Sequence, residues 1–248
     1  ISRLHKLNWV ILMLEINKIH NLDCIEGLKQ LSDKSVDCII TDPPYNLNKE
    51  GIVNDDSLWG YELEYYRVLK DNSWLCIYCS IGEVSNVIKL IEKQGFKYEW
   101  QHITYIDNGM VRGRIGFNNF MLCLIFSKGE AKLRNITKDV YKCSTSSKQR
   151  NSIKHPTPKK VKAIHQLVKG FSNEGDLILD PFMGSGTTAL ACKQNYRDFI
   201  GFEIDLNYVE TAQKRLSQKM LFPLAQTQEG GNGIPPTNKL VGILPKVL

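Results

Sequence analysis

The sequence lacks a hydrophobic run long enough to cross a membrane. Within its 248 residues the apolar stretch near the start, residues 9–12, is much shorter than the roughly 20 residues that a spanning helix requires. No signal-peptide cleavage pattern accompanies this stretch. Residues 1–12 are therefore expected to form an N-terminal extension, and the sequence predicts a cytoplasmic protein with no membrane partner.

A disulfide framework is also missing. The chain has seven cysteines, an odd number, and most of them fall inside expected strands or helices. Cys76 and Cys79 have the spacing of a zinc knuckle, but they lie in an apolar run and no second Cys or His pair has matching spacing. This pattern favours buried thiols in a reducing compartment, and no metal is expected.

The charge balance lacks a strong excess of either sign. The chain has 32 basic and 26 acidic residues, for a net charge of +6. This modest positive charge fits a polyanionic partner better than a membrane surface. The length suits one α/β domain with a sizeable core.

The first informative motif follows an apolar, β-branched run at residues 36–41. Asp42-Pro43-Pro44-Tyr45 ends this run, which predicts a buried strand that opens into a rigid loop. Because proline fixes its own φ and restricts the residue before it, the loop holds acceptors beside the Tyr45 ring. That arrangement suits a planar group with an amine edge, such as adenine or cytosine. The alternative is a plain Pro-Pro turn with Tyr45 covering the core.

The second motif combines a strand, a glycine turn and a helix. Residues 176–180 form an apolar run, Gly184-Ser185-Gly186 forms the turn, and helix-forming residues continue to residue 193. The glycines allow a ligand to approach the backbone, and a helix N-terminus offers free amides. A second strand ends at Glu203, where nucleotide-binding folds place an acid on ribose hydroxyls. No Gly-Lys-Ser/Thr follows the glycines, which excludes a P-loop.

Together these motifs resemble those of the amino-group DNA methyltransferases that use S-adenosylmethionine. The matching segments are Asp42-Pro43-Pro44-Tyr45, Lys154-His155-Pro156-Thr157, Asp180-Pro181-Phe182-Met183-Gly184-Ser185-Gly186-Thr187-Thr188 and Phe199-Ile200-Gly201-Phe202-Glu203. The catalytic motif precedes the cofactor motif, as in the β-class subgroup, which includes modification enzymes of the MboII type. The likeness covers residues 13–221, which we expect to form the methyltransferase domain.

The resemblance implies roles for individual residues. The implied catalytic residues are Asp42, Pro43, Pro44 and Tyr45. The implied S-adenosylmethionine site consists of Asp23, Cys24, Asp42, His155, Thr157, Asp180, Phe182, Gly184, Ser185, Gly186, Thr187 and Glu203. From the residues alone, Asp23 is a helix N-cap.

Two helix-poor basic stretches are candidates for DNA contact. Arg112 and Arg114 lie in a glycine-rich segment, and Lys148 and Arg150 lie in residues 128–154. The latter stretch matches the family's target-recognition segment in position, although a solvated loop is the alternative. Double-stranded DNA is the expected partner, and a cognate restriction endonuclease and a second copy of the chain are further candidates.

The alternation of strands and helices predicts a doubly wound, mostly parallel, Rossmann-like sheet. Both motif loops follow strands, so these two strands should be adjacent at the switch point. The sheet then has a circularly permuted methyltransferase order, with the strand beside 199–203 supplied by residues 14–20. Residues 98–106 and 120–127 should pair as an antiparallel hairpin at one edge.

Other expected elements are a helix over residues 59–69 and a strand over residues 73–80. Residues 222–248, rich in glycine and proline, should be a flexible tail or a loosely docked strap.

The expected function is methyl transfer from S-adenosylmethionine to N6 of adenine in double-stranded DNA, within a restriction-modification or related system. In the family that the chain resembles, an Asp at the position of Asp42 is commoner among adenine enzymes. The alternatives are an N4-cytosine enzyme, an RNA or protein methyltransferase, or an inactive DNA-recognition subunit that binds the cofactor.

Overall fold

The structure is a computed structural model that describes residues 14–44, 60–107, 111–112, 117–135, 138–143, 161–218 and 240–241. Its elements in chain order are β1 (Leu14–Glu15), β2 (Lys18–His20), α1 (Cys24–Lys29), β3 (Val36–Thr41), α2 (Glu62–Val68), β4 (Leu69–Cys79), η1 (Ile81–Glu83), α3 (Val84–Lys93), β5 (Lys97–Ile106), β6 (Val111–Arg112), β7 (Phe117–Asn118), β8 (Phe120–Lys128), β9 (Val140–Cys143), α5 (Val161–Phe171), β10 (Leu177–Asp180), α6 (Thr187–Gln194), β11 (Asp198–Phe202), α7 (Leu206–Ser217) and β12 (Leu240–Val241).

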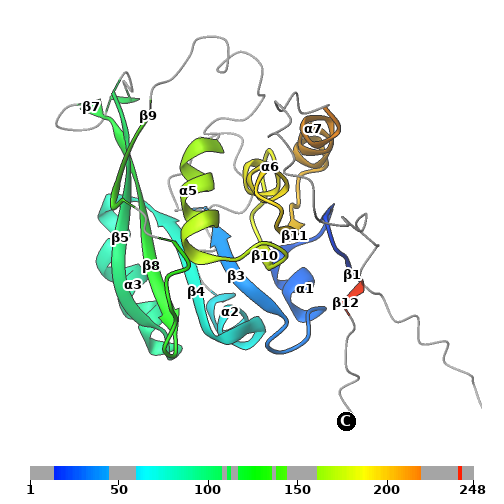
Figure 1. The fold of residues 1–248 in the computed structure, drawn as a ribbon, viewed down its shortest axis with the longest axis horizontal. Coiled ribbons are helices and arrows are strands. Elements are labelled where there is room, and N and C mark those ends of the chain that lie inside the picture. The colour runs from blue at the N-terminus through cyan, green and yellow to red at the C-terminus, as the bar shows by residue number, and fades with distance from the viewer. Residues whose placement is uncertain are drawn as a thin grey trace, which may run out of the picture.

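An eight-stranded sheet organises the chain, with strand order β2-β11-β10-β3-β4-β8-β5-β9 (Figure 1). Neighbouring strands from β2 to β4 are parallel, and β8 is antiparallel to both β4 and β5. The predicted α/β fold is confirmed. The position of β2 beside β11 also confirms that the N-terminal part of the chain supplies the strand next to the one that ends before Glu203.

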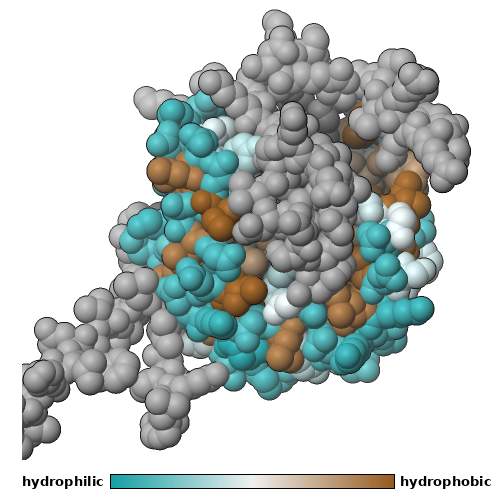
Figure 2. Space-filling model, turned by 180° about the vertical axis from the view of Figure 1, so that it is seen from behind, coloured by the Kyte–Doolittle hydropathy of each residue, from teal (hydrophilic) through white to brown (hydrophobic). Residues whose placement is uncertain are grey.

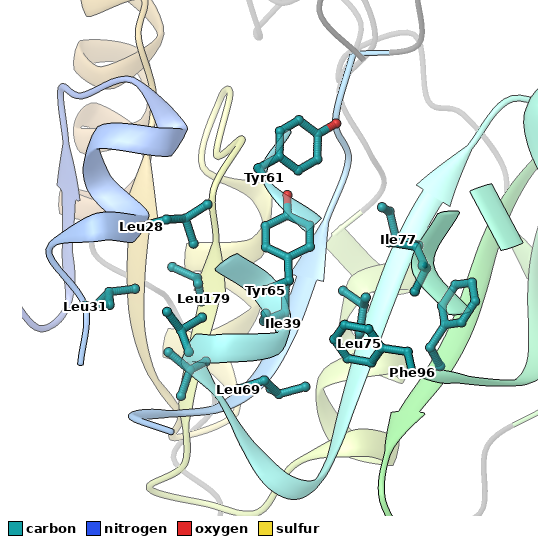
Figure 3. Close-up of a cluster of buried hydrophobic side chains, with 14 of the residues drawn as sticks. Leu28, Leu31, Ile39, Tyr61, Tyr65, Leu69, Leu75, Ile77, Phe96 and Leu179 are labelled. Carbon is teal, nitrogen blue, oxygen red and sulfur yellow. The ribbon is translucent and has the colours of Figure 1, made fainter. Parts of the chain in front are cut away.

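Both faces of the sheet are covered by helices, which explains the nearly continuous apolar runs of the central strands. Side chains from α1, α2 and α3 pack on one face, where Ile39, Leu75 and Leu179 are buried (Figure 3). Side chains from α5, α6 and α7 pack on the other face, against Cys38 and Ile40. Figure 2 shows the side of α1, α2 and α3 from outside, where most of the coloured surface is hydrophilic.

The strand predicted over residues 14–20 is broken into two. Asn17 adopts a left-handed conformation, with φ of 63°, and separates β1 from β2. Its side chain holds this turn on β11, because Nδ2 donates to Oδ1 of Asp198 at 2.7 Å and Oδ1 accepts from the amide of Phe199 at 3.1 Å. Asn tolerates the left-handed region better than most residues. The alternation of apolar and polar residues, on which the prediction of one strand rested, does not indicate such a turn.

The boundary between α2 and β4 also differs from the prediction. The strand begins at Leu69 instead of residue 73, and Leu69 pairs with Val36 in the sheet. The buried ammonium of Lys128 donates to the carbonyls of Tyr66 at 2.7 Å and Leu69 at 2.6 Å, so it caps the end of the helix. The helix therefore ends where it does because of a contact from Lys128, which lies about 60 positions further along the chain.

Two short strands extend the predicted topology. Within residues 128–154, where no element was predicted, β9 pairs in parallel with the outer edge of β5, with Val140 opposite Ile103. This strand lies outside the predicted antiparallel pair of β5 and β8. Within the predicted tail, β12 pairs with β1, with Leu240 opposite Glu15.

Buried thiols lie in the sheet as the sequence predicts. Cys76 and Cys79 are both buried within β4. Among the residues that the structure describes, no helix is long and apolar enough to span a bilayer.

Candidate active site

The two motif loops lie at the topological switch point of the sheet. β3 and β10 are adjacent, with Cys38 opposite Ile178 and Ile39 opposite Leu179. From β3 the chain continues to β4 on one side, whereas from β10 it continues to β11 on the other (Figure 1). Ligands of doubly wound sheets bind at such a point, beyond the carboxyl ends of the strands. The predicted adjacency of these two strands is confirmed.

The first loop begins at Asp42, directly after β3. Asp42 and Pro44 are half-buried and Pro43 is buried. The next strand, β4, carries Tyr78 near this loop. Burial first, and then nearby charges that include Asp42, raise the pKa of the Tyr78 phenol well above its usual range. Asp42 therefore lies half-buried directly after the carboxyl end of β3 and near the phenol of Tyr78.

Asp180 is the buried acid of the second loop, with only 3% of its surface exposed. Its Oδ1 accepts from the hydroxyl of Thr41 at 2.9 Å and from the amide of Phe182 at 3.1 Å, and its Oδ2 accepts from the hydroxyl of Thr188 at 2.6 Å. Burial raises the pKa of the carboxyl to about 7, although these three hydrogen bonds act in the opposite direction. The carboxylate therefore joins the strand before Asp42 to residues 181–186, which we call the cofactor loop after the role predicted for them.

The glycine turn needs the conformations that glycine allows. Gly184 and Gly186 have φ of 51° and 78°, and Gly186 is the N-cap of α6. A Cβ atom added at Gly186 would lie 2.7 Å from the Cβ of Ala212 in α7, so a larger residue would separate the turn from that helix. The turn is therefore tightly packed against α7, with Gly186 buried and Gly184 half-buried.

Glu203, directly after β11, contacts the same turn. Its Oε2 accepts from the amide of Gly184 at 2.7 Å, and its Oε1 accepts from the amide of Asp205 at 2.9 Å. Burial raises the pKa of this half-buried carboxyl, and the two backbone amides lower it. A carboxylate has about four acceptor positions, so each oxygen can take a further donor such as a ribose hydroxyl.

Arg215 in α7 supports the turn and was not anticipated from the sequence. Its guanidinium donates to the carbonyl oxygen of Ser185, to the Ser185 hydroxyl at 2.9 Å and to the Thr187 hydroxyl at 3.4 Å. Burial lowers the pKa of Arg215. Ser185 and Thr187, both predicted to contact the cofactor, are buried. No local pattern in the sequence distinguishes Arg215 from the other basic residues of α7.

Aromatic rings gather between α1 and the cofactor loop. The rings of Tyr61 and Phe182 meet edge to face with their centroids 5.1 Å apart. The centroids of the Tyr61 and Tyr65 rings are 5.2 Å apart (Figure 3). Tyr61 lies just before α2 and was not among the predicted site residues. Tyr61 and Cys24, the first residue of α1, belong to the same apolar cluster. Tyr61 and Tyr65 are buried, whereas the half-buried ring of Phe182 can stack on a flat heterocycle.

The start of α1 brings Asp23 and Cys24 to the same edge of the sheet. Oδ1 of Asp23 accepts from the amides of Ile25 at 2.9 Å and Glu26 at 3.4 Å, which confirms its role as the N-cap. Burial raises the pKa of the Cys24 thiol to about 12, so this thiol is neutral at physiological pH.

Several predicted site residues lie outside the described residues. They are Tyr45, Arg114, Lys148, Arg150, His155 and Thr157. Arg112 lies in β6, where its backbone pairs with Phe117 of β7. Within the described parts of the chain, no group of three or more His, Cys, Asp or Glu side chains could bind a metal ion.

Comparison with known proteins gives this arrangement an identity. The family model for N6/N4 DNA methylases matches residues 36–214, more than half of the chain. The chain belongs to this family. The methylase is 31% identical over 229 residues to the type II methyltransferase M.HpaI of Haemophilus parainfluenzae, covering 79% of this chain and 73% of the relative. It is 30% identical over 259 residues to the type II methyltransferase M1.MboII of Moraxella bovis, covering 83% and 98%. The predicted likeness to MboII-type enzymes is confirmed.

Solved structures agree with this assignment. The methylase superposes on the complex of M1.HpyAVI with S-adenosylmethionine with a TM-score of 0.65 and 30% identity, covering 80% of this chain and 98% of that one. The PvuII DNA methyltransferase, described as cytosine-N4-specific, has a TM-score of 0.69 at 18% identity, covering 82% and 87%, and supports the fold alone.

Methylases of this family use S-adenosylmethionine as the methyl donor. The described residues fit this cofactor. Glu203 is half-buried and contacts the glycine turn at the start of α6, and the half-buried ring of Phe182 packs on the buried Tyr61.

The raised pKa of Asp180 predicts a specific dependence of stability on pH. Between about pH 4 and about pH 7 the folded protein keeps a proton on Asp180 that the unfolded chain has lost, so folding stability falls as the pH rises through this range. We expect the free energy of unfolding of the wild type, relative to Asp180→Asn, to decrease by about 2–4 kcal/mol across that window. Urea denaturation at several pH values measures this difference.

The control for that experiment is Glu174→Gln, which removes an exposed carboxylate. A wild-type profile parallel to that of Asp180→Asn over the whole range would contradict the prediction.

Proposed function

We propose that the methylase transfers a methyl group to N6 of adenine within a specific sequence of double-stranded DNA, as the modification enzyme of a restriction-modification system. The observation that carries this proposal is the position of the Asp42-Pro43-Pro44 loop, one strand away from the cofactor loop at the switch point. An intact loop at this position favours catalysis over an inactive recognition subunit. A cytoplasmic location follows from a DNA substrate, and a cognate endonuclease and a second copy of the chain are the partners we infer.

The exocyclic nitrogen of a base is a weak nucleophile because its lone pair is delocalised into the ring. In the proposed mechanism the carboxylate of Asp42 and the carbonyl of Pro43 accept hydrogen bonds from the amine, which favours a tetrahedral nitrogen. Pro44 keeps the loop extended, and Tyr45 stacks on the base. S-adenosylmethionine supplies an electrophilic methyl group on a sulfonium, so that alignment and electrostatic stabilisation are the main tasks of the protein.

A paired base hides its amine, so the target must leave the duplex. Flipping a base costs a few kcal/mol, which contacts to the base and to the DNA backbone offset. Asp42 is half-buried at the carboxyl end of β3, where such a base can reach it, whereas the base cannot reach the buried Asp180.

The proposed cofactor site combines described residues with two that lie outside them. Glu203 binds the ribose hydroxyls, and the half-buried ring of Phe182, which packs on the buried Tyr61, contacts the adenine ring. The turn formed by Gly184, Ser185, Gly186 and Thr187 faces the cofactor, as do Asp23 and Cys24, and His155 and Thr157 bind its amino-acid end. Asp180 contributes through the loop that it holds, because its carboxylate is buried and accepts hydrogen bonds from three protein groups.

Substitution of Glu203 tests the cofactor site. Glu203→Ala should weaken S-adenosylmethionine binding by about 1–3 kcal/mol, because the ribose hydroxyls lose their acceptor and the amide of Gly184 loses its partner. Titration calorimetry measures the affinity. Glu210→Ala, which removes an exposed carboxylate on α7, is the control. Equal affinity of both variants and the wild type would refute the assignment of Glu203.

The basic residues Arg112, Arg114, Lys148 and Arg150 are proposed to contact DNA phosphates. Contacts of this kind release counterions, so the logarithm of the association constant should fall linearly with the logarithm of the salt concentration. Replacing Lys148 and Arg150 together with Gln should make this slope shallower by about 2, one unit for each phosphate that is no longer neutralised. Fluorescence anisotropy with a duplex measures the slope. An affinity independent of salt would exclude this interface.

The choice of adenine over cytosine depends on Asp42. A carboxylate accepts a hydrogen bond more strongly than a hydroxyl and carries its charge near the nitrogen that becomes transiently positive, which would help with either base. In the family, an Asp at this position is commoner among adenine enzymes and a Ser among cytosine enzymes. The structural likeness to a cytosine-N4-specific enzyme, at 18% identity, extends to the fold alone.

The reaction product decides between the bases. The methylase should form N6-methyladenine in unmodified plasmid DNA, and Asp42→Ala should abolish the product while cofactor affinity stays within about 1 kcal/mol of the wild type. Mass spectrometry of the digested nucleosides identifies the methylated base, and calorimetry gives the affinity. N4-methylcytosine as the sole product would assign the enzyme to cytosine, and methylated RNA without methylated DNA would refute the proposed substrate.

A further inference from the structure

Thr41, the last residue of β3, has a polar side chain in a place that no ligand can reach. Only 1% of its surface is exposed, and its hydroxyl donates to Oδ1 of Asp180 at 2.9 Å. A buried hydroxyl costs stability unless it is hydrogen-bonded, and a Val of similar shape would satisfy the packing of a strand. The hydroxyl therefore requires an explanation beyond packing.

The bond joins two strands beyond the residues that pair in the sheet. The register between β3 and β10 runs from the pair Cys38 and Ile178 to the pair Ile39 and Leu179. Thr41 lies two residues further on, where the site opens at the switch point. On its other side, β3 remains paired with β4, with Thr41 opposite Ile77. The hydrogen bond from Thr41 to Asp180 therefore holds β3 to β10 beyond the last pair of residues in their register.

The acceptor end of this link is rigid. The same oxygen of Asp180 accepts from the amide of Phe182 at 3.1 Å, and the other oxygen accepts from the hydroxyl of Thr188 at 2.6 Å. Thr188 belongs to α6, so the carboxylate is tied to the cofactor loop and to the helix that follows it. A displacement of Thr41 relative to Asp180 would change the distance between the two motif loops.

We propose that Thr41 is a positioning residue: its hydrogen bond to Asp180 sets the position of the adjacent Asp42 relative to the cofactor loop. The proposal rests on the function proposed above. Consecutive Cα atoms are about 3.8 Å apart, so the bond acts one residue away from the proposed acceptor of the target amine. A displacement of about 1 Å in a reacting group can lower the rate about a hundredfold. A small shift of Asp42 after loss of this hydrogen bond is therefore enough to slow methyl transfer.

The side chains of Thr41 and Thr188 provide a matched pair for the test. Both donate to the same carboxylate, and both are buried. Thr41 links it to the catalytic strand, whereas Thr188 links it to a helix on the cofactor side. If Thr41 positions Asp42, loss of its hydroxyl should reduce the turnover number. Loss of the Thr188 hydroxyl should mainly reduce cofactor affinity.

The experiment measures transfer of a labelled methyl group to unmodified plasmid DNA at saturating cofactor, with the affinity for S-adenosylmethionine determined by calorimetry. We expect Thr41→Val to lower kcat by about tenfold or more and to change the cofactor Kd by less than about twofold. Thr41→Ser, which keeps the donor, should restore most of the rate. Thr188→Val should raise the cofactor Kd by about threefold to tenfold and retain more kcat than Thr41→Val.

Urea denaturation identifies any variant that is not folded under the assay conditions, and Thr41→Ala replaces Thr41→Val if the valine prevents folding. Equal losses of kcat in Thr41→Val and Thr188→Val would overturn the positioning role, because they would indicate a general effect of disrupting the buried network. Unchanged kcat in Thr41→Val, or no rescue by Thr41→Ser, would also overturn it. A wild-type protein that binds the cofactor but transfers no methyl group to DNA would overturn the proposed function as well, so the two failures are distinct.

Discussion

The carboxylate of Asp180 is the interaction on which the arrangement of the site depends. It lies at the end of a central strand, buried, and accepts hydrogen bonds from β3, from the cofactor loop and from α6. Burial of an acid is unfavourable, and the three donors offset only part of that cost, as the raised pKa shows. In return, two loops separated by about 140 residues in the sequence are held at one point. Removal of the carboxylate itself would affect both loops.

Asp180 and Glu203 show how burial separates the roles of two acids that the sequence treats alike. Each follows an apolar strand, and each was predicted to bind the cofactor. Asp180 is almost fully buried and accepts three hydrogen bonds from the protein, whereas Glu203 is half-buried and accepts one backbone amide on each oxygen. The first therefore acts as an internal link, and the second retains the capacity to bind a ligand. Position in the sequence could not distinguish them, because the difference arises from the neighbouring strand and helix.

Sequence reasoning identified the parts of the structure that depend on local pattern. Apolar strands that end in Asp42, Asp180 and Glu203, together with the rule that ligands bind at the switch point, gave the parallel order and the adjacency of β3 and β10. It missed contacts made across long separations. Arg215 reaches Ser185 from another helix, Lys128 ends α2 from a distant strand, and Asn17 turns the chain by binding β11. These side chains are common on surfaces, so only the fold reveals their partners.

The permuted strand order has a consequence for synthesis of the chain. Asn17 and β2 pair with residues about 180 positions later, and β3 pairs with β10 about 140 positions later. While the ribosome is still translating the middle of the chain, one backbone edge of the apolar strand β3 is unpaired, because its partner β10 has not yet been synthesised. Exposed strand edges of this kind favour aggregation. The order of motifs that places the catalytic loop first therefore makes completion of the central sheet one of the last events of folding, and gives a nascent chain of this class a long interval in which chaperones can bind it.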